Sequence, residues 1–404
     1  MKSIRDVYRV GKGPSSSHTM GPERAARRFL AQHPHAEQFR VVLYGSLSKT
    51  GRGHGTDRVL YEVLGSERTE IVFSEETPAD LQHPNTLDFF AFVGGAEIGK
   101  MRVQSIGGGD IVVNNEVAGD LDDTYPENSF AEIKQFCTWR YISLSEYVEL
   151  NEGVEIWDFL ANIWNVMKQS IQDGLATDGI LPGGLNVERK AKHLYEQERR
   201  DEIPQIREAR MVCAYAYAVA EQNADNGIVV TAPTCGSAGV LPAVLMYMQK
   251  RYDYPDKKML EALAVAGIIG SLVKRNASIS GAECGCQAEI GTATSMAAAA
   301  LGSLKDYSID EMEYAAEIAM EHQLGLTCDP ICGLVQIPCI ERNAVAAKRA
   351  LDAFNLAYFL CGTRNISFDM VVRTMKETGI NINGKYRETS EGGLAKLYNR
   401  RRVE

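Results

Sequence analysis

The feature that most constrains the fold of this chain is a change of sequence pattern near residue 150. Before it, short runs of β-branched and aromatic residues alternate with turn residues, as in the strands of one sheet. These runs cover residues 39–44, 70–73, 87–92, 101–106 and 110–114. After it, Ala-rich segments carry apolar residues at three- and four-residue steps, which predicts helices. They cover residues 206–222, 237–250, 258–275, 286–304, 309–323 and 339–361.

The predicted fold class is therefore α+β, with a small mixed α/β N-terminal domain over residues 1–148 and a larger, predominantly α-helical domain over residues 149–404. Two helices are expected within the first domain, one beginning at Pro22 and one following Gly55. The helical segments 258–275 and 286–304 are apolar on most faces, so they should lie at the centre of the bundle.

Charge and hydropathy narrow the choice of partners. The formal net charge is −10, which argues against nucleic acid because phosphate binding favours a basic face. The longest apolar runs, 211–220 and 262–273, are shorter than the roughly 18 residues that a membrane span needs. The first residues lack the apolar core of a signal peptide. The sequence thus predicts a soluble, cytoplasmic protein with no nucleic-acid or membrane partner.

Cysteines are concentrated in the second half of the chain. There are nine, an odd number, and a secreted disulfide framework favours even numbers in much shorter chains. Eight of them fall between Cys213 and Cys361. In a reducing compartment this clustering predicts metal or redox chemistry, although any single cysteine is more often a small core residue.

Two segments at expected loop–helix junctions hold most of these cysteines. One contains Cys284 and Cys286, and the other contains Cys328, Cys332 and Cys339. A helix N-terminus stabilises a thiolate, which is the form that binds metal. The C-x-C and C-x3-C spacings fit the usual zinc pairs poorly, and the regular ferredoxin run is missing. An iron–sulfur cluster held by dispersed thiolates remains open at this point.

Three loops carry hydroxyl groups or histidine. Residues 13–22, Gly-Pro-Ser-Ser-Ser-His-Thr-Met-Gly-Pro, precede a helix, whose N-terminus favours an anion such as a carboxylate or phosphate; an ordinary capping loop is the alternative. Residues 45–57 hold Lys49 and His54 among glycines but lack the spacing of a phosphate loop, and His54 is suited to proton transfer. Residues 231–239 contain glycines and hydroxyl groups at the expected start of another helix. They would either line a pocket or pack tightly against a neighbouring element.

Together, five segments resemble the iron–sulfur-dependent bacterial L-serine ammonia-lyases (L-serine dehydratases) in their single-chain form. The segments are Gly-Pro-Ser-Ser-Ser-His-Thr-Met-Gly-Pro, Gly-Arg-Gly-His-Gly-Thr-Asp, Ala-Pro-Thr-Cys-Gly-Ser-Ala-Gly, Gly-Cys-Gln-Ala-Glu-Ile-Gly and Cys-Asp-Pro-Ile-Cys-Gly. The resemblance runs from residue 4 to about residue 375. It also makes the small domain similar to the allosteric substrate-binding domain of some phosphoglycerate dehydrogenases.

The resemblance implies a reaction and a set of site residues. L-Serine would be dehydrated and deaminated to pyruvate and ammonia, with a [4Fe–4S] cluster whose open iron acts as a Lewis acid on the hydroxyl group. By motif, the cluster ligands would be Cys286, Cys328 and Cys339. The base is expected to be His54, with His18 as second choice. Lys49 is the third expected catalytic residue and would help to hold the substrate carboxylate. The expected substrate-binding residues are Ser15, Ser16, Ser17, Thr19 and Asn276. The assembly is expected to be a homodimer.

Other classes explain less of the sequence. A pyridoxal-phosphate dehydratase would use a Schiff-base lysine and would leave the clustered cysteines without a role. A related cluster enzyme could act on L-cysteine or L-threonine, and analysis of the product would distinguish it. A regulator that binds zinc or an amino acid would give no role to the three consecutive serines, 15–17, or to His18 and His54.

Overall fold

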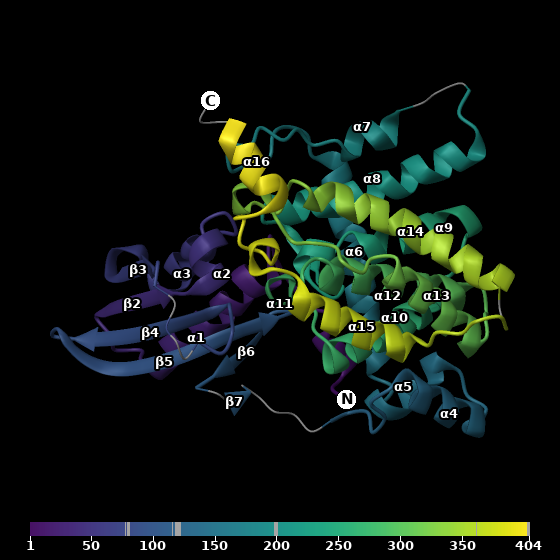
Figure 1. Ribbon diagram of the computed structural model, residues 1–404, viewed down its shortest axis with the longest axis horizontal. Helices are drawn as coiled ribbons and strands as arrows, with labels where there is room; N and C mark the ends of the chain where they lie inside the picture. Colours follow the sequence, from purple (N-terminus) through teal and green to yellow (C-terminus); the bar gives the residue numbers. More distant parts are fainter. Residues whose placement is uncertain are drawn as a thin grey trace.

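The computed structural model describes residues 1–404 except 77, 79–80, 115, 118–122, 198–200, 361 and 402–404. A mixed sheet lies at one end of the molecule and a body of helices at the other (Figure 1). The strand order is β3-β2-β4-β5-β6-β7. The strands are β2 (Gln38–Leu43), β3 (Thr69–Phe73), β4 (Thr86–Val93), β5 (Ala96–Gly107), β6 (Asp110–Val113) and β7 (Glu116–Val117). The α+β class and all five predicted strands are confirmed.

One face of the sheet packs on two helices, α1 (Gly21–Gln32) and α3 (Thr56–Leu64). Alternate residues of β2 are buried, because successive side chains of a strand point to opposite faces. The ring of Phe29 in α1 packs at a tilt against that of Phe89 in β4, with the ring centroids 5.3 Å apart. Residues 45–50, expected to be part of a glycine-flexed loop, instead form a short helix, α2 (Gly45–Thr50).

The helical body is built around two central helices, as the sequence predicts. In α10 (Asp256–Asn276) the residues from Ala262 to Val273 are all buried, and α12 (Thr292–Leu304) is buried over almost its whole length. The long helices around them are α6 (Ile156–Ala176), α8 (Pro204–Ala224), α9 (Val240–Tyr252), α13 (Ile309–Glu321), α14 (Cys339–Leu360) and α15 (Phe368–Asn381). Shorter ones are α4 (Phe130–Arg140), α5 (Leu144–Glu152), α7 (Ala191–Glu196), α11 (Gly281–Cys284) and α16 (Gly393–Arg401).

The start of the chain packs on the helical body rather than on the sheet. Ile4, Val7 and Tyr8 belong to the same apolar core as the long helices, and the Tyr8 hydroxyl donates to the Leu263 carbonyl at 2.7 Å. Strand β1 (Val10–Lys12) pairs antiparallel with β8 (Ile228–Val230), a long-range pairing that the sequence pattern did not predict. Helices α4 and α5 also join this core. The domain boundary at residue 148 stays a prediction.

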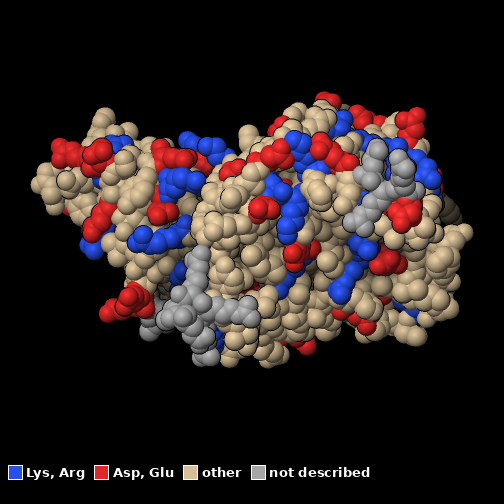
Figure 2. Space-filling model, turned by 90° about the horizontal axis from the view of Figure 1, so that it is seen from above, with Lys and Arg blue, Asp and Glu red and all other residues tan. Residues whose placement is uncertain are grey.

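The surface carries charges of both signs. On the face seen in Figure 2, Lys and Arg side chains are interspersed with Asp and Glu side chains over both parts of the molecule. None of the described helices is long and apolar enough to cross a membrane. The eight described cysteines are all free.

Candidate active site

Two histidines are stacked at the junction between the sheet and the helical body. His18 lies in a helical turn, Ser16–Met20, and His54 in the loop between α2 and α3. Their ring centroids are 4.4 Å apart with an interplanar angle of 29°. Burial lowers the pKa of His54 to about 4; burial and then the neighbouring His54 lower that of His18. Both imidazoles are therefore neutral at pH 7, the form that accepts a proton.

Hydrogen bonds fix the orientation of both rings. His54 Nδ1 lies 2.9 Å from the Thr50 carbonyl oxygen, which can only accept, so we assign the proton to Nδ1 and leave Nε2 as a proton acceptor. His18 Nε2 lies 3.1 Å from both Ser46 Oγ and Thr50 Oγ1. The Thr56 hydroxyl donates to the His18 carbonyl at 2.6 Å.

The predicted hydroxyl loop wraps around this pair. Residues 15–19 are all buried. Ser15 Oγ accepts from the His18 amide at 3.1 Å, and Ser17 Oγ lies 2.9 Å from His18 Nδ1. The Thr19 hydroxyl donates to the His54 carbonyl at 2.8 Å. Three of the predicted substrate-binding side chains thus contact the predicted catalytic histidines, which they hold in place.

Glu388 joins the two histidines, and sequence analysis missed it. Its Oε1 lies 3.6 Å from His18 Nδ1 and 3.5 Å from His54 Nε2. Burial raises the pKa of Glu388, as do the nearby Glu289 and Cys286. The residue is held by the Ser46 hydroxyl, which donates to its carbonyl at 2.7 Å. An acidic residue in a loop of Gly, Ser and Thr was the only sequence signal.

The predicted metal ligands gather beside the histidines. The ligand atoms of Cys286, Glu289 and Cys328 lie within 4.8 Å of one another. Cys339, the first residue of α14, is outside that set, but Cys286 still contributes, after burial, to raising the pKa of Cys339. A hydrogen bond from Cys328 and the nearby Arg342 lower the pKa of Cys286 to about 6. Cys286 is therefore mostly a thiolate at pH 7.

Arg342 and Glu289 complete the surroundings of the thiols. Arg342 Nη1 donates to the Thr327 carbonyl at 2.6 Å, and Nη2 lies 3.4 Å from Asp329 Oδ1. Burial, and then Cys286, raise the pKa of Glu289 to about 8. Its Oε1 accepts from the Thr234 hydroxyl at 2.7 Å. The predicted loop 231–239 therefore lies against the thiol group.

The histidine and thiol groups share backbone contacts. The Glu388 amide donates to the Cys328 carbonyl, and the Cys328 amide to the Tyr386 carbonyl, both at 2.8 Å. A Cβ on Gly53, next to His54, would lie 2.5 Å from the Gly333 carbonyl oxygen. The segment between α15 and α16 passes along this junction (Figure 1). Histidines from the N-terminal part and cysteines from the helical body thus form one continuous site.

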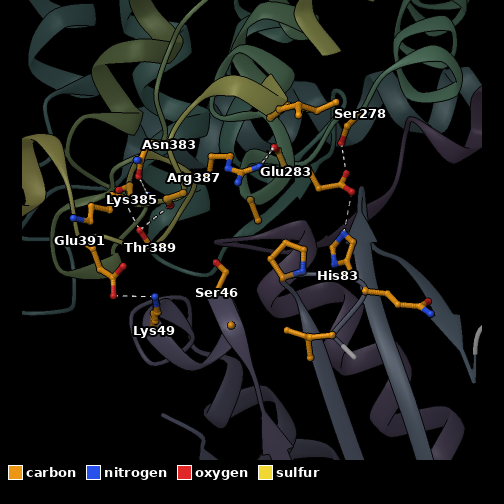
Figure 3. Close-up of a pocket in the computed structure, with 18 of the residues that line it drawn as sticks. Ser46, Lys49, His83, Ser278, Glu283, Asn383, Lys385, Arg387, Thr389 and Glu391 are labelled. Carbon is orange, nitrogen blue, oxygen red and sulfur yellow. Dashed lines mark hydrogen bonds and ion pairs between the residues drawn. The ribbon is translucent and has the colours of Figure 1, made fainter. Parts of the chain in front are cut away.

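Two predicted residues and the remaining cysteines lie further out. Lys49 pairs with Glu391 at 2.9 Å, on the wall of a cavity of about 960 Å³ between sheet and body (Figure 3). The Asn276 side chain donates to the Asn128 carbonyl at 2.8 Å. Within the described part of the chain, neither side chain forms a hydrogen bond or ion pair with either histidine. Cys284 lines the same cavity, Cys235 lies 3.7 Å from Met20, and Cys361 falls outside the described residues.

Known proteins are similar to this chain over nearly its whole length. Residues 74–395 match the family described as serine dehydratase alpha chain, and residues 3–73 match serine dehydratase beta chain. The chain belongs to the serine dehydratase family. It is 42% identical to the L-serine dehydratase of Streptomyces coelicolor, over 97% of this chain and 98% of that protein. It is also 39% identical to L-serine dehydratase 2 of Escherichia coli, over 98% of each, and 35% identical to the Helicobacter pylori enzyme, over 98% of each.

Proposed function

We propose that this protein is an L-serine ammonia-lyase that converts L-serine to pyruvate and ammonia. The observation that carries the proposal is the pair of buried, neutral histidines directly beside a group of thiols. Removal of water from serine needs a base for the α-proton and a group that helps hydroxide to leave. Full-length relatives named L-serine dehydratase support the same reaction.

We also propose that the thiols hold a [4Fe–4S] cluster through Cys286, Cys328 and Cys339. Thiolates are the usual ligands of such clusters, and Arg342 places a positive charge among the thiols. Gly281 leaves space beside them, because a Cβ there would lie 3.3 Å from Cys328 Sγ and 2.7 Å from a Glu289 carboxyl oxygen. When bound, the cluster would supply a Lewis acid for the substrate hydroxyl group.

His54 is proposed to take the α-proton on Nε2. The Thr50 carbonyl holds the Nδ1 proton and so fixes the tautomer with a free Nε2. Glu388 Oε1, 3.5 Å from that nitrogen, can accept a hydrogen bond from the protonated ring. His18 is the second choice, because hydroxyl groups already surround its Nε2. The enamine product then becomes the imine and hydrolyses to pyruvate and ammonia without further help from the protein.

The hydroxyl loop is proposed to help hold the substrate carboxylate. Ser15, Ser16, Ser17 and Thr19 immediately precede α1, whose N-terminus favours an anion. Lys49, on the cavity wall, would attract the carboxylate toward the site. Asn276 is kept as a substrate-binding candidate, but its contact with Asn128 offers the least support.

The proposal is tested by anaerobic purification, quantitation of iron and sulfide, and an assay for pyruvate from L-serine. Iron-loaded protein should form pyruvate, and removal of iron with a chelator should abolish this activity. Pyruvate formation by iron-free protein would overturn the cluster mechanism. Parallel assays with L-threonine and L-cysteine identify the preferred substrate, and sulfide release would mark the cysteine reaction.

A homodimer in the cytoplasm is a further part of the proposal. Free cysteines suit a reducing compartment. Trp139 and Tyr141, at the end of α4, are both well exposed, and aromatic side chains are enriched at protein interfaces. Light scattering of the purified protein should give twice the mass of one chain.

A further inference from the structure

Three buried side chains at the histidine pair each bring one possible metal-ligand atom to the same place. His18 Nδ1 and His54 Nε2 lie 3.6 Å and 3.5 Å from Glu388 Oε1, and all three atoms lie within 4.8 Å of one another. The three residues are 0%, 1% and 6% exposed. Two imidazoles and one carboxylate are among the ligand sets by which proteins bind zinc.

Hydrogen bonds leave the facing nitrogen of each imidazole without a proton. In His54 the Thr50 carbonyl accepts the Nδ1 proton, so Nε2 keeps its lone pair. In His18, Nε2 lies 3.1 Å from the hydroxyl oxygens of both Ser46 and Thr50. Each hydroxyl already donates its one proton to a carbonyl, Ser46 to that of Glu388 at 2.7 Å and Thr50 to that of Ser46 at 2.9 Å. Both hydroxyls therefore accept from His18 Nε2, and we assign the lone pair of this ring to Nδ1.

The distances between these atoms suit a metal ion better than a shared proton. A hydrogen bond joins its donor and acceptor at roughly 2.7–3.2 Å, and both nitrogen–oxygen distances exceed that range. Ligand atoms about 2.0–2.2 Å from a tetrahedral zinc ion stand about 3.3–3.6 Å from one another. The observed 3.5 Å and 3.6 Å fall within this second range. One divalent cation can therefore bind all three groups.

The polar groups next to these atoms are compatible with a bound cation. The Ser17 hydroxyl lies 2.9 Å from His18 Nδ1 and 3.4 Å from Ser15 Oγ, so its proton can turn to Ser15 and leave Nδ1 to a metal. The second carboxyl oxygen of Glu388, Oε2, is buried and has no hydrogen-bond partner among the described residues. Buried polar atoms are nearly always paired, and a cation at the carboxylate would satisfy this one.

The cavity between the sheet and the helical body gives an ion a route to this place. It is lined by Arg387 and Thr389, the chain neighbours of Glu388. It is also lined by Ser46, whose hydroxyl contacts His18 (Figure 3). Its volume of about 960 Å³ has room for a hydrated ion. The ligand atoms thus lie behind the wall of a cavity that an ion can enter.

We propose that His18, His54 and Glu388 form a zinc site, separate from the cysteines, at which a Zn²⁺ ion inhibits the enzyme. The ion is bound by His18 Nδ1, His54 Nε2 and Glu388 Oε1, and Ser17 Oγ or a water molecule is the fourth ligand. Imidazole ligands favour zinc over magnesium and calcium, which prefer oxygen. The inhibition rests on the proposed function, because the ion binds the lone pair with which His54 is proposed to take the α-proton. The binding of zinc does not rest on it.

The first test measures zinc binding to the iron-loaded protein by equilibrium dialysis under anaerobic conditions. One ion per chain should bind at micromolar zinc, with the iron content unchanged. The X-ray absorption of the bound zinc should show nitrogen and oxygen neighbours at about 2.0–2.2 Å and no sulfur at about 2.3 Å. Absence of a bound ion would overturn the inference. So would sulfur neighbours or released iron, because zinc would then have taken the cysteines.

Two variants test the ligands separately. Glu388→Gln keeps the size of the side chain and removes the carboxylate, and His54→Asn keeps a donor for the Thr50 carbonyl and removes Nε2. Each should weaken zinc binding by about 100-fold or more, because loss of a group that only orients a metal ligand already costs about 10- to 100-fold. Unchanged affinity in either variant, with the iron content and unfolding midpoint of the wild type, would overturn the site.

Glu391→Gln is the matched control. Glu391 is also a glutamate beside this cavity, but its carboxylate pairs with Lys49. The variant should bind zinc within twofold of the wild type. A loss as large as that in Glu388→Gln would show that zinc binds to the cavity wall instead and would overturn the assignment.

The second test measures pyruvate formation from L-serine as zinc is added. Zinc should abolish the activity at the concentration that saturates binding, and dilution into zinc-free buffer should restore it. Bound zinc that leaves the activity unchanged would overturn the inhibition and, with it, His54 as the base. A wild type that forms no pyruvate even without zinc would overturn the proposed function, whereas the binding measurements would still decide the zinc site.

Discussion

The histidine pair and the thiol group lie side by side at the junction between the sheet and the helical body. They differ in the protonation states that their surroundings favour. His18 and His54 are neutral, and contacts from Ser17, Ser46 and Thr50 orient them. Among the thiols, the pKa of Cys286 is lowered to about 6, while the same hydrogen bond, followed by burial, raises that of Cys328. The first region is complete as a proton acceptor, whereas the second brings together thiol and carboxyl groups that would lose their protons to bind a metal. Variants should therefore separate cofactor retention from proton transfer.

The largest effect is expected from the thiols. Cys286→Ala, Cys328→Ala and Cys339→Ala should each abolish both iron content and pyruvate formation, because two thiolates hold a cluster inadequately. Iron analysis and the pyruvate assay measure this. Cys213→Ala in α8 is the control and should keep both. Retention of iron in any of the three variants, with loss in Cys284→Ala or Cys332→Ala, would reassign the ligands.

The next effect is confined to the histidine region. His54→Ala should lower kcat by about 10² to 10⁴, the usual contribution of a positioned acid or base, with iron content intact. His18→Ala should raise KM more than it lowers kcat if it belongs mainly to the substrate-binding loop. Exchanged phenotypes would exchange the two roles, and unchanged turnover in His54→Ala would remove that residue from the mechanism.

The pH dependence of the free energy of unfolding tests whether His54 is neutral in the folded protein. His54 has a pKa of about 4 when folded and 6.5 as its ordinary value, so the unfolded chain binds more protons between these values. The free energy of unfolding should thus fall by up to about 3 kcal/mol, from this histidine, as the pH is lowered from 6.5 toward 4. Urea unfolding of the wild type and of His54→Asn measures it. Identical pH dependence in both proteins would contradict the assignment.

The smallest effect is expected at Lys49. Its ion pair with Glu391 is 43% and 47% exposed, and exposed pairs contribute at most about 1 kcal/mol. Lys49→Ala should therefore raise the KM for L-serine by less than about fivefold. A rise of a hundredfold would place this lysine directly on the substrate carboxylate instead.

Much of the fold was predictable because its signals are local. Short runs of β-branched and aromatic residues between turn residues located the five strands, and helical apolar patterns located the central helices. The histidine and cysteine loops were singled out because several segments in the same order resemble one family, whereas each loop alone left an ordinary structural alternative open. By contrast, β1 pairs with a strand more than 200 residues away, a contact that no local pattern encodes.

The site residue that sequence analysis missed has the same long-range character. Glu388 meets His54 only because the segment between α15 and α16 returns to the junction. Residue type alone cannot show which acidic side chain a distant segment will bring to the histidines.

The packing of the first residues against the helical body has a consequence for synthesis on the ribosome. Tyr8 bonds to Leu263, 255 residues later in the chain. At about 5–20 residues per second, the ribosome needs roughly 10 to 50 s to make the partner after Tyr8. The sheet can form during this interval, while the apolar side chains of Ile4 and Val7 still lack their core. Chaperones that shield apolar segments of nascent chains would find their target at this end of the molecule.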